Sequence, residues 1–517
     1  MQSHVVCGLI APIRFRGHTM LKRRSCGVLL HPTSLPGHDG IGTLGDNARK
    51  FVDLLSTMGM SYWQVLPLTP PACGNSPYSS LSAFAGNPLL LDLHQLAQEG
   101  DLPLEVACSL FPKERVDYGG VSDVKLGLLH QAAATFLAAE RSSRTEEFWH
   151  FCNTTPWLHD FALFMALKQH YKGKSWQKWP REAALPTAET YEKASLKLGP
   201  EIGAQKYLQW QFSRQWQALR SYAASRGVSF IGDIPIFVAY DSADVWRNRD
   251  LFLLDGQGKP TAVAGVPPDY FCRTGQLWGN PLYDWEILER QGFNWWVERF
   301  RHAFALFDGV RIDHFRGFEA AWQVPANEHT AERGVWGAGP GGRLFEAVRS
   351  ALGELPIIAE DLGVITPEVE ALRDRFGFPG MKILQFAFDS GPANPYLPHN
   401  CVKNCVVYTG THDNDTTLGW YSSQDEHHRN LVRDYVGSNG RDIVADIIRM
   451  ALMSVADTVV IPFQDILGLP GTARMNLPGT AFGNWEWRFS WDMIHRGLAG
   501  EMNSRLERYG RRRGSMS

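Results

Sequence analysis

The hydrophobic positions along the chain gather in short runs, and each run ends in polar, glycine or proline residues. Eight of these runs have the length and composition of buried strands. They begin at Gly27, Tyr62, Val228, Phe307, Pro356, Met381, Cys405 and Asp457. The segments between them carry apolar residues at helical spacing. Strands that alternate with helices form parallel sheets, and eight such strands predict an α/β fold of the (β/α)₈ TIM-barrel type.

The clearest helical pattern follows the first run, in the segment "DNARKFVDLLSTMG". Its apolar residues recur three and four positions apart, at Phe51, Leu54, Leu55 and Met58. Asp46 is the expected N-cap, and Gly59 stands where a helix commonly ends. The pattern therefore predicts a helix over residues 46–58 with one buried face.

Two connections between the predicted strands are much longer than the others. Residues 92–225, between the second and third strands, are rich in Leu, Ala, Gln, Glu and Lys and predict an inserted helical subdomain. Residues 240–306, between the third and fourth strands, include "GVPPDYFCRTGQLWGNPLYDW" and predict an aromatic loop insertion. Loops this long are usually functional or disordered, and the many aromatic residues argue against disorder. We expect residues 21–517 to form one catalytic barrel domain with these insertions.

Composition excludes several classes of protein. The 517 residues carry a formal net charge of −3, whereas a nucleic-acid partner would require a basic surface. The eight cysteines include no CxxC pair, so no zinc site or disulfide framework is predicted. No apolar run reaches the roughly 20 residues of a membrane helix. We therefore expect neither a nucleic-acid nor a membrane partner.

The first residues differ from the rest of the chain. Residues 1–38 contain no Asp or Glu, and basic residues follow the apolar stretch "VVCGLIAPI" instead of preceding it. This order argues against a secretory signal. We interpret residues 1–20 as a disordered leader or as the product of a start codon placed too early, with Met20 as the true start. The protein is then expected in the cytoplasm; the alternative is a plastid, if residues 1–20 are a transit peptide.

Charged residues stand where several predicted strands end. In "FDGVRIDHFRG", Arg311 and Asp313 are two positions apart and must point to the same face of a strand. Asp233 and Glu360 end the third and fifth strands, and Asp413 follows the seventh. The active site of a TIM barrel lies at this end of the strands, so these four carboxyl groups are expected to share one pocket.

Clustered acids bind a divalent metal, perform acid/base chemistry or are merely solvated. No glycine-rich phosphate loop accompanies these acids, which weakens the metal interpretation. Their surroundings are rich in aromatic and amide side chains, which suit a carbohydrate. Two carboxyl groups can break a glycosidic bond without a metal or cofactor, so none is expected. Arg311 beside Asp313 would favour its ionised, nucleophilic form, and Glu360 would serve as the protonated acid.

Several longer motifs resemble one family. They are "LLHPTSLPG", "SPYSSLSAFAGNP", "GDIPIFVAYDSADVW", "TGQLWGNPLYDW", "GVRIDHFRGFEA", "IIAEDLG", "GMKILQFAF", "YTGTHDNDTT" and "PGTAFGNWEWR". Together the sequence resembles the 4-α-glucanotransferases of the α-amylase clan, also called amylomaltases or disproportionating enzymes. The resemblance extends from about Gly27 to Phe489. It implies transfer of an α-1,4-glucan segment to the 4-hydroxyl of an acceptor glucan or glucose through a covalent intermediate with retained configuration.

The resemblance also implies a role for individual residues. Asp313 corresponds to the nucleophile, Glu360 to the general acid/base and Asp413 to the carboxylate that stabilises the transition state. Four further residues correspond to the rest of the catalytic constellation: Arg311, His412, Asp233 and Tyr78. Positions that line the glucan groove correspond to Ser76, Asp269, Trp278, His314 and Asn484.

The sequence departs from the family pattern in the aromatic loop. Cys272 and Arg273 stand where family members often carry smaller residues, which leaves the acceptor-side contacts and chain-length preference open. Two alternative functions also stay open: an α-1,4-glucan hydrolase of the same clan, and a glucan-binding protein without catalysis. The expected partners are maltooligosaccharides and glucose, and the expected state is a monomer or a weak homo-oligomer.

Overall fold

A nearly closed parallel barrel forms the centre of the protein in the computed structural model, which describes residues 20–72, 74–104, 111–268 and 273–514. The barrel strands are β1 (Ser25–Leu29), β2 (Tyr62–Gln64), β3 (Ser229–Pro235), β6 (Gly309–Asp313), β9 (Ile357–Ala359), β10 (Gly380–Ile383), β11 (Cys405–Tyr408) and β12 (Thr458–Pro462). They pair in the order β10-β11-β12-β1-β2-β3-β6-β9. A backbone hydrogen bond of 2.9 Å from Ala359 N to Pro379 O joins β9 to the start of β10. Each predicted strand overlaps one of these eight, so the predicted barrel is confirmed.

The first helix shows how local sequence places an element against the barrel. Helix α1 (Asp46–Met58) ends at Gly59, whose φ of 78° lies in the left-handed region that favours glycine. The N-cap is Gly45, not Asp46 as expected. A Cβ at residue 45 would lie 2.0 Å from Asp92 Oδ2, so the tight approach of the chain requires glycine there. Asp46 becomes the first helical residue, where its charge still favours the positive end of the helix dipole.

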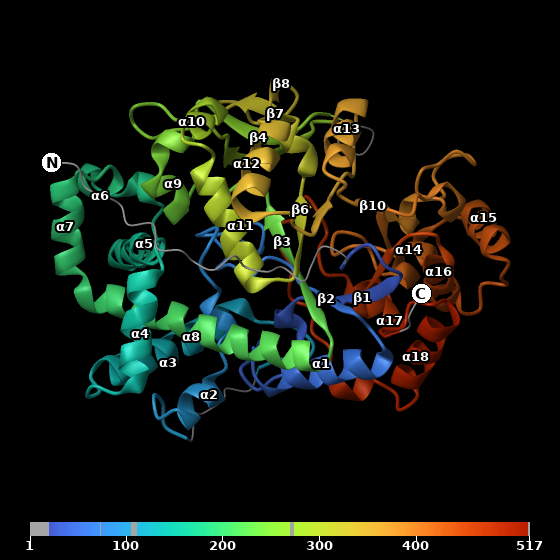
Figure 1. The fold of residues 1–517 in the computed structure, drawn as a ribbon, viewed down its shortest axis with the longest axis horizontal. Helices are drawn as coiled ribbons and strands as arrows, with labels where there is room; N and C mark the ends of the chain where they lie inside the picture. The colour runs from blue at the N-terminus through green and yellow to red at the C-terminus, as the bar shows by residue number, and fades with distance from the viewer. Residues whose placement is uncertain (1–19, 73, 105–110, 269–272, 515–517) are drawn as a thin grey trace.

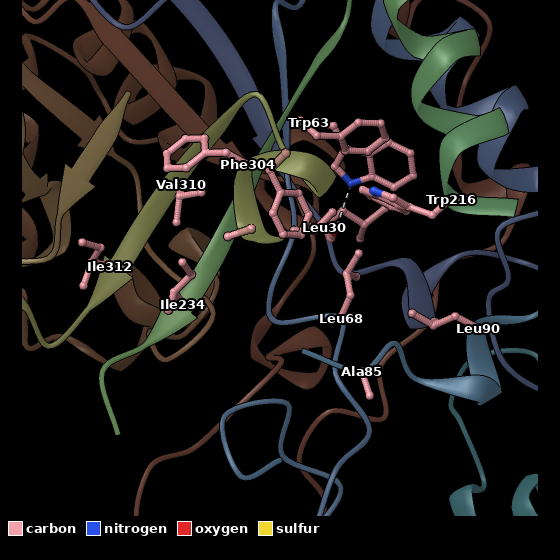
Figure 2. Close-up of a cluster of buried hydrophobic side chains, with 14 of the residues drawn as sticks. Leu30, Trp63, Leu68, Ala85, Leu90, Trp216, Ile234, Phe304, Val310 and Ile312 are labelled. Carbon is pink, nitrogen blue, oxygen red and sulfur yellow. Dashed lines mark hydrogen bonds between the residues drawn. The ribbon is translucent and has the colours of Figure 1, made fainter. Parts of the chain in front are cut away.

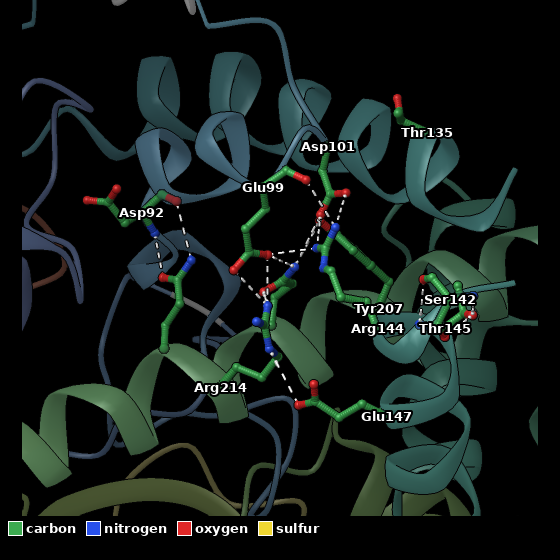
Figure 3. Close-up of polar contacts among 12 residues, drawn as sticks. Asp92, Glu99, Asp101, Thr135, Ser142, Arg144, Thr145, Glu147, Tyr207 and Arg214 are labelled. Atoms are coloured by element: carbon green, nitrogen blue, oxygen red, sulfur yellow. Dashed lines mark hydrogen bonds and ion pairs between the residues drawn. The ribbon is translucent and has the colours of Figure 1, made fainter. Parts of the chain in front are cut away.

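Helices fill the long connection between β2 and β3. They are α2 (Leu93–Gln98), α3 (Tyr118–Leu137), α4 (Ser143–Thr154), α5 (Leu158–His170), α6 (Arg181–Ala184), α7 (Ala188–Lys197) and α8 (Gly199–Ser225). Figure 1 shows α3 to α8 on one side of the barrel and the C-terminal helices on the other. Arginine and acidic side chains tie α4 and α8 to the segment after α2 (Figure 3): Arg144 lies 2.6 Å from Asp101 and 2.7 Å from Glu99, and Arg214 lies 2.8 Å from Glu99. We call these residues the insertion cluster.

A second sheet lies beside the barrel and was not predicted from the sequence. Its antiparallel strands pair in the order β5-β4-β7-β8: β4 (Ala262–Val266), β5 (Gln276–Pro281), β7 (Ala320–Pro325) and β8 (Val335–Ala338). Strands β4 and β5 lie within the segment expected to be an aromatic loop, and helices α9 (Ala243–Arg247), α10 (Trp285–Arg290) and α11 (Asn294–Leu306) complete it. Glycine, proline and tryptophan interrupt the alternation of apolar and polar residues there, so the two-residue period that predicts a strand is absent.

The remaining helices follow the later strands. They are α12 (Gly342–Leu352), α13 (Pro367–Arg375), α14 (Thr417–Ser423), α15 (Glu426–Val436), α16 (Ile443–Met453), α17 (Phe463–Ile466) and α18 (Leu498–Arg508). No helix in the described ranges has the length and hydropathy of a membrane span.

Large aromatic rings join the barrel wall to its surrounding helices. Trp63 of β2 is fully buried, its ring lies 5.1 Å from Phe230, and Phe230 lies 4.7 Å from Trp216 of α8. The indole of Trp63 donates a 2.8 Å hydrogen bond to Leu30 O (Figure 2). This packing fixes the positions from which the strand ends project.

A residue near the C-terminus joins the first strand to the segment that leads into the last strand. The guanidinium of Arg511 is fully buried and donates to the carbonyls of Leu452, Ser25, Ser454 and Ala456 at 2.8, 3.2, 2.9 and 2.8 Å. Arg511 belongs to the "RRRGSMS" segment, beyond the limit of the motif resemblance. Its N–H donors bond to buried backbone carbonyls, and two of these, of Leu452 and Ser454, also accept from Arg24.

Candidate active site

The C-terminal ends of β3 and β6 place three charged side chains together. Asp233 of β3 lies opposite Arg311 of β6 in the strand register. One Arg311 nitrogen donates to Asp233 Oδ2 at 2.6 Å, and another lies 2.9 Å from Asp313 Oδ1. Arg311 and Asp313 therefore share one face, as their spacing predicts. Burial raises the pKa of Asp233 to about 7, and the charge of Arg311 opposes that rise.

Tyr78 and His412 form the next layer around this ion pair. The Tyr78 hydroxyl donates to Asp233 Oδ2 at 2.8 Å, and the Tyr78 ring stacks on His412 with centroids 5.0 Å apart. His412 Nε2 lies 3.5 Å from Asp413 Oδ2. Burial lowers the pKa of His412 although Asp413 opposes the shift, so a neutral imidazole is favoured at neutral pH. Tyr78 thus connects the β3 side of the site to the loop after β11.

Glu360 occupies a buried position immediately after β9. Its Oε2 accepts from the backbone N–H of His314 at 2.6 Å, and its Oε1 accepts from that of Leu362 at 2.9 Å. The first bond links Glu360 to the residue that follows Asp313. Burial raises the pKa of Glu360 to about 8; the charge of Asp313 adds to the rise, and Arg311 and the two N–H groups oppose it. Glu360 is therefore mostly protonated at pH 7 and can donate a proton.

An open groove of about 420 Å³ runs past Asp313. Four other predicted residues also line it: Ser76, Tyr78, Trp278 and His314. The Trp278 side chain is 38% exposed, and its ring meets His314 edge to face at 4.7 Å. His314 has a φ of 53°, a left-handed conformation that costs a non-glycine residue about 1 kcal/mol. Its bond to Glu360 and its contact with Trp278 hold that conformation beside the groove.

The loop after β12 contacts the site from the Asp413 side. Asn476 Nδ2 donates to Asp413 Oδ1 at 2.6 Å, and Arg474 donates to the Asp413 carbonyl at 2.5 Å. Asn484, predicted to line the groove, instead accepts from Leu477 N at 2.9 Å and stabilises this loop. Sequence reasoning missed Asn476 and Arg474. Their position in the loop after the eighth strand was the signal that could have identified them.

Three further points concern the predicted site: two residues outside the described ranges, metal binding, and a buried acceptor without a partner. Asp269 and Cys272 lie outside the described residues. Within the described ranges, no group of three or more His, Cys, Asp or Glu side chains is arranged to hold a metal ion. Asp233 Oδ1 is buried without a hydrogen-bond partner in the described part of the chain, which leaves one acceptor free at the centre of the site.

A TIM barrel that carries one groove-facing carboxylate and one buried, protonated carboxyl group is typical of enzymes that act on glycosidic bonds. The model of the 4-α-glucanotransferase family matches residues 30–494. The chain belongs to this family, as its motifs predict, and the family's members are glycosyl-transferring enzymes that act on α-glucans.

Individual relatives agree with the family model. The chain is 50% identical to the 4-α-glucanotransferase of Synechocystis over 95% of its own length and 99% of the relative's. It is 47% identical to the chloroplastic/amyloplastic 4-α-glucanotransferase of Solanum tuberosum, over 90% of its own length and 82% of the relative's. The structure of the Streptococcus agalactiae amylomaltase in complex with acarbose superposes with a TM-score of 0.92 at 38% identity, covering 95% of this chain and all of that one.

Proposed function

We propose that the protein transfers a segment of an α-1,4-glucan to the 4-hydroxyl of another glucan or of glucose by double displacement. Asp313 attacks the anomeric carbon while Glu360 protonates the leaving oxygen. The Asp313–glucosyl bond is then broken by the acceptor hydroxyl, whose proton returns to Glu360. Two inversions at one carbon keep every new bond in the α configuration.

One observation carries this proposal: a carboxyl group beside a guanidinium and a buried, protonated carboxyl group lie at neighbouring strand ends. Asp313 lies 2.9 Å from a guanidinium nitrogen and faces the groove, which favours a nucleophilic carboxylate. Glu360 is buried, with a pKa of about 8, which favours an acid. Asp413, held by Asn476, is available to bind sugar hydroxyls and to stabilise positive charge in the transition state.

The remaining residues support these groups. Arg311 orients Asp233 and Asp313. Tyr78 donates to Asp233 and stacks on His412, which lies beside Asp413. Trp278 and His314 provide the groove with a flat face for a sugar ring, and Ser76 contributes a hydroxyl. The acarbose bound by the Streptococcus agalactiae relative supports an oligosaccharide as the occupant of the corresponding groove here. A monomer or weak homo-oligomer, acting in the cytoplasm or in a plastid, is part of this proposal.

The test is to incubate the protein with maltotriose and to separate the products by chain length. We expect glucose together with a ladder of longer glucans, while the number of reducing ends stays nearly constant, because each transfer forms one glycosidic bond for each that it breaks. Newly formed bonds should all be α by nuclear magnetic resonance. A steady rise in reducing ends without longer products would replace this proposal with the hydrolase, and binding without turnover would replace it with a glucan-binding protein.

A further inference from the structure

Phe482 is the most exposed large apolar side chain in the described part of the chain, with 91% of its surface open to solvent. No ring-to-ring contact of Phe482 is found among the described residues. Phenylalanine is usually buried, although a single exposed apolar residue is not unusual in itself. The significance of this ring therefore depends on where its loop is attached.

The loop that carries Phe482 is closed by its own hydrogen bonds. Asn484 Oδ1 accepts from Leu477 N at 2.9 Å, and Asn484 Nδ2 donates to the carbonyl of Thr480 at 3.0 Å. Thr480 N donates to Leu477 O at 3.2 Å. These bonds hold residues 477–484 as a defined turn and thereby limit the positions that its exposed ring can take.

The base of the same loop is fixed to the active site. Asn476, immediately before the loop, donates to Asp413 Oδ1 at 2.6 Å. Trp485, immediately after it, has its ring centroid 5.8 Å from His412 and 6.0 Å from Tyr78. Both ends of the loop therefore contact predicted site residues, and the exposed Phe482 lies in the loop between them.

We propose that Phe482 is a stacking platform for a glucose unit of the α-glucan chain that lies beyond the unit reacting at Asp313. The apolar face of a glucose ring matches a flat phenyl ring, and burial of both faces favours contact. Trp278, which packs on His314, offers such a face on the Asp313 side of the site, and Phe482 offers one on the Asp413 side. This inference rests on the proposed function and adds a determinant of chain-length preference to it.

The test compares Phe482→Ala with the unchanged protein on maltotriose, maltoheptaose and short-chain amylose. On this proposal, only the longer glucans extend from the reacting carbon to the loop of residues 477–484. We expect KM for maltoheptaose and amylose to rise about 5-fold with little change in kcat, because the lost contact is the same in ground and transition states. The rise for maltotriose should be smaller. Phe482→Trp, which keeps a flat ring, should restore the KM for the longer substrates.

A matched control is Trp149→Ala, which removes a 56% exposed aromatic side chain from α4, in the helical insertion. We expect this variant to keep the KM values of the unchanged protein at every chain length. Equal changes for all three substrates in Phe482→Ala, or none, would overturn the platform. So would a change in sedimentation coefficient without a change in the KM ratio, since Phe482 would then contact a second copy of the chain. Failure of the unchanged protein to transfer glucan would instead contradict the proposed function.

Discussion

Two regions of this protein bury charged side chains, and the pKa of a glutamate shifts in opposite directions in the two. In the insertion cluster, Glu99 receives hydrogen bonds from Arg144, Arg214 and Gln211. Burial alone would raise the pKa of Glu99, but the bonds from Arg214 and Gln211 outweigh it and the net shift is downward. At the barrel rim, burial dominates and raises the pKa of Glu360 to about 8.

The difference lies in the number of cationic donors for each acid and in burial, since the Glu99 side chain is 28% exposed and Glu360 is 9% exposed. Two arginines share Glu99 and Asp101 in the insertion cluster, whereas Arg311 is the one cation that the described hydrogen bonds and ion pairs place against Asp233 and Asp313. The rim also opens onto a groove. A buried charge is therefore not in itself a sign of function; a carboxyl group left protonated beside a groove is a stronger one.

The largest expected effect comes from Asp313→Asn. This change keeps the shape of the side chain and removes the charge that attacks the anomeric carbon, so kcat/KM for maltotriose should fall by about 10⁴-fold or more. The melting temperature should stay close to that of the unchanged protein, because Asp313 is 30% exposed. Near-normal turnover in this variant would remove the distinction between the active site and the insertion cluster.

Arg144→Leu tests the insertion cluster in the opposite direction. It leaves the Asp101 carboxylate, which is 4% exposed, without its arginine partner. The free energy of unfolding measured in urea should therefore fall by about 3 kcal/mol. This value is at the low end for a broken buried pair because Arg144 itself is 29% exposed. We expect kcat/KM of the folded variant to change less than twofold, a matched contrast to Asp313→Asn. A loss of activity comparable to that of Asp313→Asn would show that both clusters serve catalysis.

Tyr78→Phe should have an intermediate effect on activity. The variant keeps the ring that stacks on His412 and loses the hydroxyl that donates to Asp233. A hydrogen bond to a charged group contributes about 2 kcal/mol, so kcat should fall about 30-fold while KM changes little. A variant that raises KM alone would assign Tyr78 to binding.

The smallest effect is the response to pH. Since Glu360 must be protonated to act as the acid, kcat/KM should fall about tenfold per pH unit above about 8. With α-maltosyl fluoride, whose leaving group needs no proton, this alkaline fall should disappear from the step that cleaves the donor. A fall that persists with the fluoride would belong to another group, such as Asp233.

The sign of the matching stability effect follows from the same shift. The pKa of Glu360 is higher in the folded protein than its ordinary value of 4.5, so the folded state binds this proton more tightly. Its contribution to stability is full below pH 4.5 and is lost as the pH rises through 8.

The barrel could be predicted from the sequence because each of its strands lies in a short, mostly apolar run that ends in polar, glycine or proline residues. The ends of those runs also identified Asp313 and Glu360 as neighbours, since the strand ends of a parallel barrel meet at one edge. The second sheet could not be predicted in this way. Its strand β5 is mostly exposed and contains glycine and proline, so it carries no periodic pattern, and its pairing with β4 is irregular between Val263 and Gly265.

Contacts between loops escaped the sequence for a related reason. The bond from Asn476 to Asp413 joins residues 63 positions apart in two irregular loops, and no local spacing encodes it. The motif predicted Asn484 in the glucan groove, whereas its side chain bonds within the loop that carries Phe482. Motifs identify which residues belong together; the direction of each side chain requires the fold.

The hydrogen bonds of Arg511 to Ser25 and to the segment before β12 have a consequence for the synthesis of the protein. β1 pairs with β12 across 433 residues, from Ser25 to Thr458, and Arg511 joins them only when the last residues of the chain are available. A ribosome adding about 5–20 residues per second needs roughly 20–90 seconds for that stretch. Throughout this interval one edge of β1 lacks its neighbour and presents free amide and carbonyl groups to other nascent chains. For most of its synthesis the unfinished sheet is therefore exposed to edge-to-edge pairing with other chains.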